Sequence, residues 1–327
     1  MTERLRWGIL ATGWISHLFT SDLKANGFDV RAVGSRSQEA ADAFAAEFGI
    51  PNAHASYEAL VADPEVDVIY VGTPHPMHAA NARLALEAGK HVLVEKSFTV
   101  NAREAREIAE LAASEGLLVL EAMWTRYLPH MARIREIIEA GTLGDVRSLI
   151  ADHTQKLPDD PAHRINALEL GGGALLDLGI YPISFAWDLF GPPTTVQSTA
   201  TYKTTGADAQ VAVVLGYDGG RIATTVSASD LKGPNVATVL GTEARIEIDA
   251  VWYSPTSFRV IAHDGTVLET YESEVVGRGM HFQAEAVERH VAAGTLAGDL
   301  LTIDESVAIM GTLDTIREQI GLRYPGE

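Results

Sequence analysis

The sequence contains no cysteine, so disulfides, zinc–thiolate sites and cysteine nucleophiles are all excluded. It also lacks any apolar run near the roughly 20 residues that a transmembrane helix needs, and we expect no membrane span. Residues 1–10 carry two arginines but neither a long apolar region nor a small-residue cleavage site. This favours a first strand over a signal peptide. We expect a cytoplasmic protein.

Positive charge is scarce as well. The 25 lysines and arginines stand against 44 aspartates and glutamates, which gives a formal net charge of −19. A field of this sign repels phosphate backbones, so we expect no nucleic-acid partner. A phosphate-bearing cofactor then needs a local basic group, which makes a well-placed arginine informative. The 11 histidines are too scattered to indicate a metal site.

The length of 327 residues exceeds one ordinary domain and suits two. Apolar residues make up 46% and charged residues 21%, a composition typical of a folded globular protein. The pattern of strands and helices changes after Met123. We therefore interpret residues 1–123 as one domain and residues 124–327 as a second.

Strand and helix patterns alternate in the first domain. We expect strands at Leu5–Leu10, Val30–Gly34, Asp67–Thr73, His91–Glu95 and Leu117–Ala122. We expect helices at Trp14–Ala25, from an N-cap at Ser37 to Phe48, at Met77–Ala88 before Gly89, and from an N-cap at Asn101 to Ser114 before Gly116. Helices of this length between strands imply right-handed parallel crossovers. The predicted fold is a doubly wound α/β Rossmann sheet.

Strand patterns dominate the second domain, after a predicted helix at Tyr127–Ala140 that ends before Gly141. We expect strands at Val146–Thr154, Thr195–Tyr202, Gln210–Tyr217, Arg221–Ser229, Asn235–Gly241, Arg245–Asp249, Ser257–His263 and Thr266–Tyr271. Two hairpin turns are indicated by Asp218-Gly219-Gly220 and Asp264-Gly265. Helices at Phe282–Ala293 and Asp304–Ile320 close the chain. The prediction is an α+β domain with a large, mostly antiparallel open sheet.

A dinucleotide-binding turn follows the first strand. Residues 8–16 read GILATGWIS, and Ala11, Gly13 and Ser16 occupy the small positions of the G-x-G-x-x-G/A fingerprint. Ala11 makes such a turn only if its backbone stays in an allowed region. The residues that we expect to bind the cofactor here are Ala11, Thr12, Gly13, Trp14 and Ile15. The alternative is an ordinary strand–helix turn, in which small residues are common.

The end of the second strand bears on the choice of cofactor. An acidic residue there would bind the ribose hydroxyls of NAD, but this chain has Ser35-Arg36-Ser37. Serine and arginine suit a 2′-phosphate, so Ser35 and Arg36 predict NADP(H) in preference to NAD(H). In the alternative interpretation, Arg36 is a surface residue and a serine caps the next helix.

The loop after the next strand, Thr73 to His78, is expected at the carboxyl edge of the sheet. Loops at that edge line the cofactor crevice. We therefore expect Thr73, Pro74 and His78 to contact the cofactor. The alternative is a simple turn and helix start, since a residue before proline avoids helical geometry.

A family resemblance appears at Ala88–Ser97, which reads AGKHVLVEKS. This stretch resembles the AGKHVxxEKP signature of the glucose–fructose oxidoreductase, inositol dehydrogenase and MocA family. The resemblance extends to the GILATGWIS turn, to the T-P-x-x-x-H segment ending at His78, and to GGGALLDLGIY, which ends at Tyr181. SYEALVADPEVDVIYVGTPHP and EAMWTRYLP resemble in particular the dimeric dihydrodiol dehydrogenases and NADP-dependent D-xylose dehydrogenases.

The resemblance implies a Rossmann domain, then a domain whose open sheet often serves in dimerisation. It implies that Lys96 is a catalytic lysine and Tyr181 the acid/base of the reaction. A tyrosine is a poor base near neutral pH, and a lysine cation nearby would stabilise its phenolate. Asp177 would lie one turn earlier if this segment is helical, and we expect it to contact the same site as a third catalytic residue. Glu95 would orient Lys96, and both residues are expected to contact the cofactor. Without the resemblance, Lys96 reads as a surface charge and Tyr181 as a core residue.

Four further residues are weaker candidates for the substrate pocket: Trp124, Arg126, Arg164 and Asn166. Trp124 is as typical of a core as of a ring platform for substrate, and Arg164 would equally hold a loop through a surface ion pair. Solvated or hydrogen-bonded roles are expected for His153, His163, His281 and Gln283.

Two positions depart from the family pattern. Ser97 replaces a proline that is often cis, which leaves both peptide isomers open, and Ala11 replaces the first glycine of the fingerprint. The sequence predicts an NADP-preferring oxidoreductase that acts on a small polyol, aldose or trans-dihydrodiol. The alternatives are a non-catalytic redox sensor and a biliverdin-reductase-like C=N or C=C reductase. A homodimer, or a dimer of dimers, through the C-terminal sheet is expected, because an open sheet face needs covering.

Overall fold

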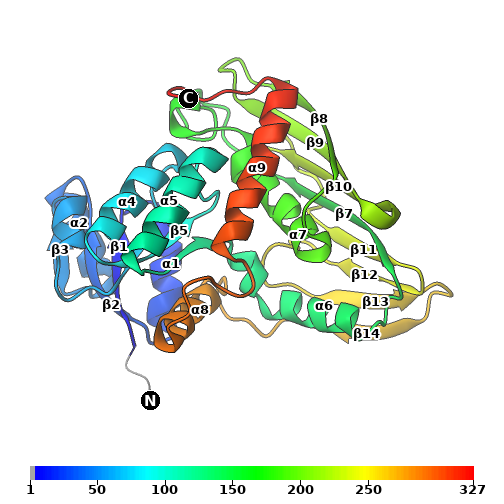
Figure 1. Ribbon diagram of the computed structural model, residues 1–327, viewed down its shortest axis with the longest axis horizontal. Helices are drawn as coiled ribbons and strands as arrows, with labels where there is room; N and C mark the ends of the chain where they lie inside the picture. Colours follow the sequence, from blue (N-terminus) through cyan, green and yellow to red (C-terminus); the bar gives the residue numbers. More distant parts are fainter. Residues whose placement is uncertain (1–3) are drawn as a thin grey trace. The chain divides into compact units, whose positions relative to one another are not determined.

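The computed structural model describes residues 4–327, which fold into two compact units (Figure 1). The first unit consists of the chain up to Trp124 together with Gly277–Val307, and the second of Thr125–Val276 and Ala308–Glu327. The chain therefore passes between the units three times. Within the described residues, no helix combines the length and apolarity that crossing a bilayer requires.

The first unit contains a six-stranded parallel sheet with strand order β3-β2-β1-β4-β5-β6. Its strands are β1 (Arg6–Leu10), β2 (Asp29–Gly34), β3 (Asn52–His54), β4 (Val68–Val71), β5 (His91–Glu95) and β6 (Val119–Ala122). Its helices are α1 (Trp14–Ala25), α2 (Gln38–Phe48), α3 (Tyr57–Val61), η1 (His75–Met77), α4 (His78–Glu87), α5 (Ala102–Glu115) and α8 (His281–Ala293). The reversal of strand order at β1 confirms the doubly wound Rossmann fold.

The local signals explain where these helices begin and end. The side chains of Ser37 and Asn101 accept hydrogen bonds from backbone N–H groups three residues on, at Ala40 and Glu104, as predicted for N-caps. Gly116 ends α5 in the left-handed conformation. β3 and α3 were not predicted, because elements of three and five residues are too short to show a period.

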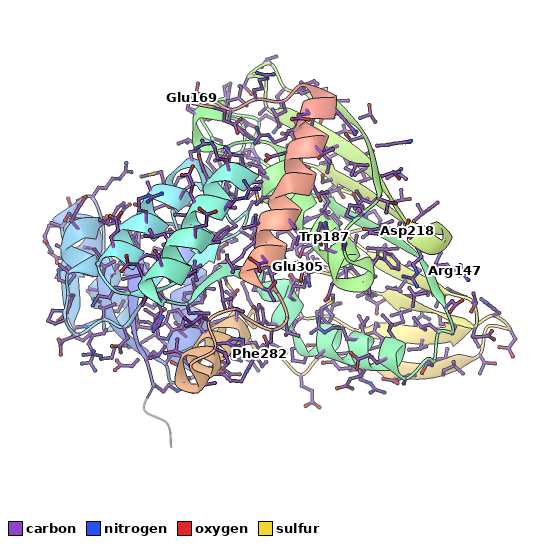
Figure 2. All side chains as sticks on the ribbon, viewed as in Figure 1. Arg147, Glu169, Trp187, Asp218, Phe282 and Glu305 are labelled. Carbon is purple, nitrogen blue, oxygen red and sulfur yellow. The ribbon has the colours of Figure 1, made fainter. Side chains whose placement is uncertain are left out.

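The second unit contains an eight-stranded sheet with order β14-β13-β12-β11-β7-β10-β9-β8. Its strands are β7 (Val146–Thr154), β8 (Thr195–Tyr202), β9 (Asp208–Tyr217), β10 (Arg221–Ala228), β11 (Ala237–Gly241), β12 (Ala244–Ile248), β13 (Phe258–Ala262) and β14 (Val267–Tyr271). The hairpin turn between β9 and β10 begins at Asp218, labelled in Figure 2. The sheet is mostly antiparallel, as predicted. One pair, β7 with β10, is parallel, which the long connection between these strands permits.

Helices cover one face of this second sheet. α7 (Ile180–Phe190) packs on β7 and β10 (Figure 1), with Trp187 toward its end (Figure 2). This helix was not predicted, because residues 180–187 are all buried and show no polar face. It follows a π-helical turn, η4 (Leu175–Gly179), and a 3-10 turn, η3 (Leu168–Leu170).

The remaining helices are η2 (Trp124–Tyr127), α6 (Pro129–Glu139), η5 (Asp218–Gly220) and α9 (Ile303–Ile320). The helix predicted from Tyr127 thus starts only at Pro129. Proline is favoured in the first turn of a helix, where its missing N–H costs no hydrogen bond. The residues before it form the separate turn η2.

Candidate functional site

Ala11 adopts the conformation that the fingerprint normally assigns to glycine. Its φ is +83°, in the left-handed region, and its N–H donates to the carbonyl oxygen of Gly34 at 3.0 Å. Alanine adopts this region less readily than glycine, because its Cβ crowds the backbone there. The tight turn out of β1 imposes this geometry.

The N-terminus of α1 is open to a ligand. Its N-cap, Gly13, is extended and exposed and offers no side chain to the first N–H groups, and no acidic residue lies in the first turn. Ser16 packs against the backbone of Gly72, directly after β4, as the third fingerprint position requires. A Cβ on Gly72 would lie 2.5 Å from the Ser16 Oγ, so only glycine permits this approach. The free N–H groups and the helix dipole suit a phosphate.

The loop after β2 carries no carboxylate. Ser35 is buried, whereas Arg36 is exposed and hydrogen bonds to Tyr57. Burial raises the pKa of the Tyr57 hydroxyl, and the charge of Arg36 opposes that shift. Ser37 is engaged in capping α2. Arg36 is thus the cation at this end of β2.

Two histidines join the loop after β4 to the loop after β5. His75 Nε2 lies 3.2 Å from the carbonyl oxygen of Lys96, and His78 Nδ1 lies 2.9 Å from that of Ser97. His78 Nε2 also contacts the carbonyl oxygen of Thr73 at 2.7 Å. Burial lowers the pKa of His78 to about 4, so the ring is neutral at pH 7. The Lys96–Ser97 peptide bond is cis, one of the two isomers that the resemblance left open.

Glu95 fixes the backbone on the other side of Lys96. Its carboxylate, 3% exposed, accepts from the Tyr70 hydroxyl at 2.6 Å and from the Lys96 N–H at 3.2 Å. The Tyr70 ring stacks on Phe19 of α1, with 3.9 Å between ring centroids. Lys96 itself is partly exposed at the carboxyl end of β5. Its main chain is therefore held from both sides, by Glu95 and by the two histidines.

In the second unit, Tyr181 lies in an aromatic cluster. The ring of His153, from β7, packs edge-on against Tyr181 at 4.9 Å and stacks on Tyr253 at 3.7 Å. Gln155 Nε2 contacts both the His153 ring nitrogen, at 2.9 Å, and the Tyr253 hydroxyl, at 3.1 Å. Sequence reasoning missed Tyr253 and Gln155. For His153, the only sequence signal was the alternation of inward and outward positions along the strand Val146–Thr154. That alternation places its side chain on the side of the sheet that the helices cover.

Asp177 and Arg164, two of the predicted site residues, come together. The Arg164 guanidinium donates to both Asp177 oxygens at 3.2 Å. The turn that carries Asp177 is anchored to β9, because Asp208 accepts from the Leu175 N–H at 2.6 Å. Burial raises the pKa of Asp208 to about 6, and the backbone N–H donors oppose the shift.

Other predicted residues serve the local structure. Arg126 is 2% exposed, pairs with Asp188 at 3.0 Å and donates to Ser184. The Asn166 amide donates to the carbonyl oxygens of residues 158 and 160 and accepts from Lys203. The hydrogen bonds of the Arg126 and Asn166 side chains thus stabilise the chain segments around these two residues. Trp124 is 2% exposed.

One expectation on α8, that for Gln283, is wrong. The Gln283 side chain is 1% exposed, whereas that of His281 is 7% exposed. The Nδ1 of His281 and both amide atoms of Gln283 have no hydrogen-bond partner in the described chain. Gln283 lies on the buried face of α8, which is rich in alanine. Composition alone does not show which face of such a helix is buried. His163, by contrast, is hydrogen bonded as expected, through Nδ1 to the N–H of Ile165.

Comparison with known proteins covers nearly the whole chain. Residues 5–123 match the family model "Oxidoreductase family, NAD-binding Rossmann fold", and residues 131–247 match "GFO/IDH/MocA C-terminal domain". The chain is similar to an aldose–aldose oxidoreductase from Caulobacter crescentus, with a TM-score of 0.87 at 22% identity over 97% of each chain. It is also similar to a 3-ketoreductase from Actinomadura kijaniata in complex with NADP and TDP-benzene, with a TM-score of 0.85 at 24% identity over 97% and 98% of the chains. At these identities, the likeness concerns the fold.

Two sequence relatives are more similar. The chain is 36% identical to trans-1,2-dihydrobenzene-1,2-diol dehydrogenase of Mus musculus, over 98% of both chains. It is also 36% identical to D-xylose 1-dehydrogenase (NADP(+)) of Hypocrea jecorina, over 98% of this chain and 93% of the relative. The two family models match residues 5–123 and 131–247, and both relatives align over 98% of the chain, so this protein belongs to the GFO/IDH/MocA family of oxidoreductases.

Proposed function

We propose that this protein transfers hydride between NADP(H) and a small polyol, aldose or trans-dihydrodiol. The observation that carries the proposal is the similarity over 98% of the chain to two dehydrogenases that act on such hydroxyl compounds. The residues up to 123 would bind the dinucleotide, and residues 124–327 the substrate. We propose the cytoplasm as the location.

The residues of the first unit fit a dinucleotide. The open N-terminus of α1 suits the diphosphate, and Arg36, with no carboxylate beside it in 35–37, suits a 2′-phosphate. When bound, the nicotinamide supplies the hydride acceptor or donor. Thr73 and Pro74 would contact the nicotinamide. His78, whose ring contacts the carbonyl oxygens of Thr73 and Ser97, would hold the loop of Thr73 and Pro74 in place. An Arg36→Asp variant should then prefer NADH.

Proton transfer is the task of the chain's own residues. We propose Lys96 and Tyr181 as the proton-transfer pair, in line with the family resemblance. The hydroxyl of Tyr181 would exchange the proton of the substrate hydroxyl, and a lysine cation favours the phenolate. Asp177, paired with Arg164, would keep Arg164 in place at the same segment. The hydrogen bonds of Glu95, His75 and His78 to the main chain at residues 96 and 97 would keep Lys96 in one position.

The test begins with direct titration of NADPH and NADH, followed by a reductase and dehydrogenase screen over aldoses, polyols and diols. Tyr181→Phe removes one oxygen and should lower kcat about a hundredfold or more with cofactor affinity unchanged. Tyr217→Phe is the matched control, because Tyr217 is a buried tyrosine of the same unit whose hydroxyl has no partner in the described chain. Full turnover by Tyr181→Phe would refute the acid/base assignment. Tight NADPH binding without turnover across the whole panel would favour the redox sensor instead.

We also propose a homodimer through the second sheet. The face opposite α7 exposes the apolar side chains of Ile150, Val214, Ile222 and Val226, which are between 39% and 52% exposed. Strand register places all four on the same side of three adjacent strands. A contiguous apolar patch of this kind is typical of a protein interface.

A further inference from the structure

Arg278 is a basic residue of the first unit that sequence reasoning did not single out. It lies in a Gly-Arg-Gly turn just before α8. Asp22, on α1, fixes this turn: its two oxygens accept from the N–H groups of Arg278 at 3.3 Å and of Met280 at 2.8 Å. The turn is thereby attached to the first helix of the nucleotide-binding fold.

The conformation of the turn depends on glycine. Gly277 has a φ of +79°, in the left-handed region, and a Cβ there would lie 2.6 Å from the Asp22 Oδ1. A side chain at 277 would therefore push the turn away from α1. The hydrogen bonds from Asp22 then hold the backbone of Arg278 at a defined position along this helix.

The Arg278 guanidinium lies beside two tryptophans. Its Cζ is 5.8 Å from the ring centroid of Trp14 and 5.2 Å from that of Trp124, within the range of cation–π attraction. Its Nε is buried and has no hydrogen-bond partner, and no carboxylate of residues 4–327 pairs with it.

We propose that Arg278 binds the diphosphate of the dinucleotide, an inference that rests on the proposed function. Trp14 is the first residue of α1 and directly follows Gly13, where the fingerprint turn receives the diphosphate. The N–H groups and dipole of one helix supply only about half a positive charge. Arg278 would add a full positive charge and two hydrogen-bond donors beside this helix N-terminus. The two tryptophans would keep its guanidinium in position before the cofactor binds.

The experiment is a titration of the purified protein with NADPH and NADH, followed through the emission of the bound reduced cofactor. Arg278→Gln should weaken both cofactors by the same factor, about tenfold to a hundredfold, because both carry the diphosphate. Arg36→Asp should weaken NADPH but not NADH. Arg289→Gln is the control, since it removes the same charge from α8, where Arg289 pairs with Asp299, and it should leave both affinities unchanged.

Four outcomes separate the possibilities. Unchanged affinities in Arg278→Gln overturn the inference while leaving the proposed function intact. Loss of NADPH binding alone also overturns it, because the residue would then recognise the 2′-phosphate. If the wild-type chain binds neither cofactor, the proposed function itself fails. If Arg278→Gln does not fold, Arg278→Lys provides the test: it keeps the charge without the planar fork, and affinities equal to those of the wild type would contradict a role for the guanidinium.

Discussion

Ala11 occupies a backbone conformation that L-residues with a Cβ adopt at a cost. Its φ of +83° places the Cβ close to the following carbonyl group, a conformation that is less favourable by about 1–2 kcal/mol. Ala11→Gly should therefore stabilise the fold by about 1 kcal/mol, measured by urea unfolding. The exposed helical residue Ala113 is the control, because Ala113→Gly should destabilise by about 1 kcal/mol. A loss of stability in both variants would contradict this account.

His78 should make stability depend on pH. Burial lowers its pKa from 6.5 to about 4, so the unfolded chain binds a proton before the folded protein does. Its contribution to stability is therefore complete above pH 6.5 and is lost as the pH falls through 4. The loss is on the order of 3 kcal/mol, at 1.36 kcal/mol per pKa unit. In urea unfolding over this range, His78→Gln should remove that part of the pH dependence. An identical slope in both proteins would rule out His78 as its source.

At the scale of elements, the N-cap of α5 offers a direct test of helix energetics. The Asn101 side chain accepts from the Glu104 N–H at 3.0 Å, and the residue is 8% exposed. Asn101→Ala should cost about 1 kcal/mol of unfolding free energy, whereas Asn101→Ser or Asn101→Asp should restore most of it. Equal losses in all three variants would show that the cap bond is not the cause.

The elements with strong local signals were predictable, and those without were not. Caps and glycine stops located α2 and α5, whereas β3 and α3 are too short to show a period, and α7 is buried all round. The site residues divide in the same way, into those that a local motif marks and those that none does.

The residues of the fingerprint turn and of GGGALLDLGIY lie in contiguous motifs, which made them recognisable in the sequence. Arg278 meets Trp14 only because Asp22 attaches a distant turn to α1, and no local pattern reports such a contact.

At the scale of the whole molecule, the exposed apolar face predicts the oligomeric state. The double variant Ile150→Glu, Ile222→Glu places charges where the side chains are 52% and 47% exposed, so the fold should tolerate them. Sedimentation should then show a monomer where the wild type is a dimer, because burying unpaired carboxylates in an interface is costly. Val267→Glu, at an exposed valine of the edge strand β14, is the control. A wild-type monomer, or a dimer in the double variant, would contradict the proposed interface.

The first unit also has a consequence for how the protein is synthesised. Its sheet comes from the start of the chain, but Gly277–Val307 belongs to the same unit. The Trp7 indole donates to Glu288 at 3.2 Å, and the Ser306 hydroxyl donates to the buried carboxylate of Glu121 at 2.7 Å. A ribosome therefore has to translate the chain through residue 307 before this unit can close. Until then, the nascent chain carries a nucleotide-binding sheet whose Glu121 still lacks its hydroxyl partner.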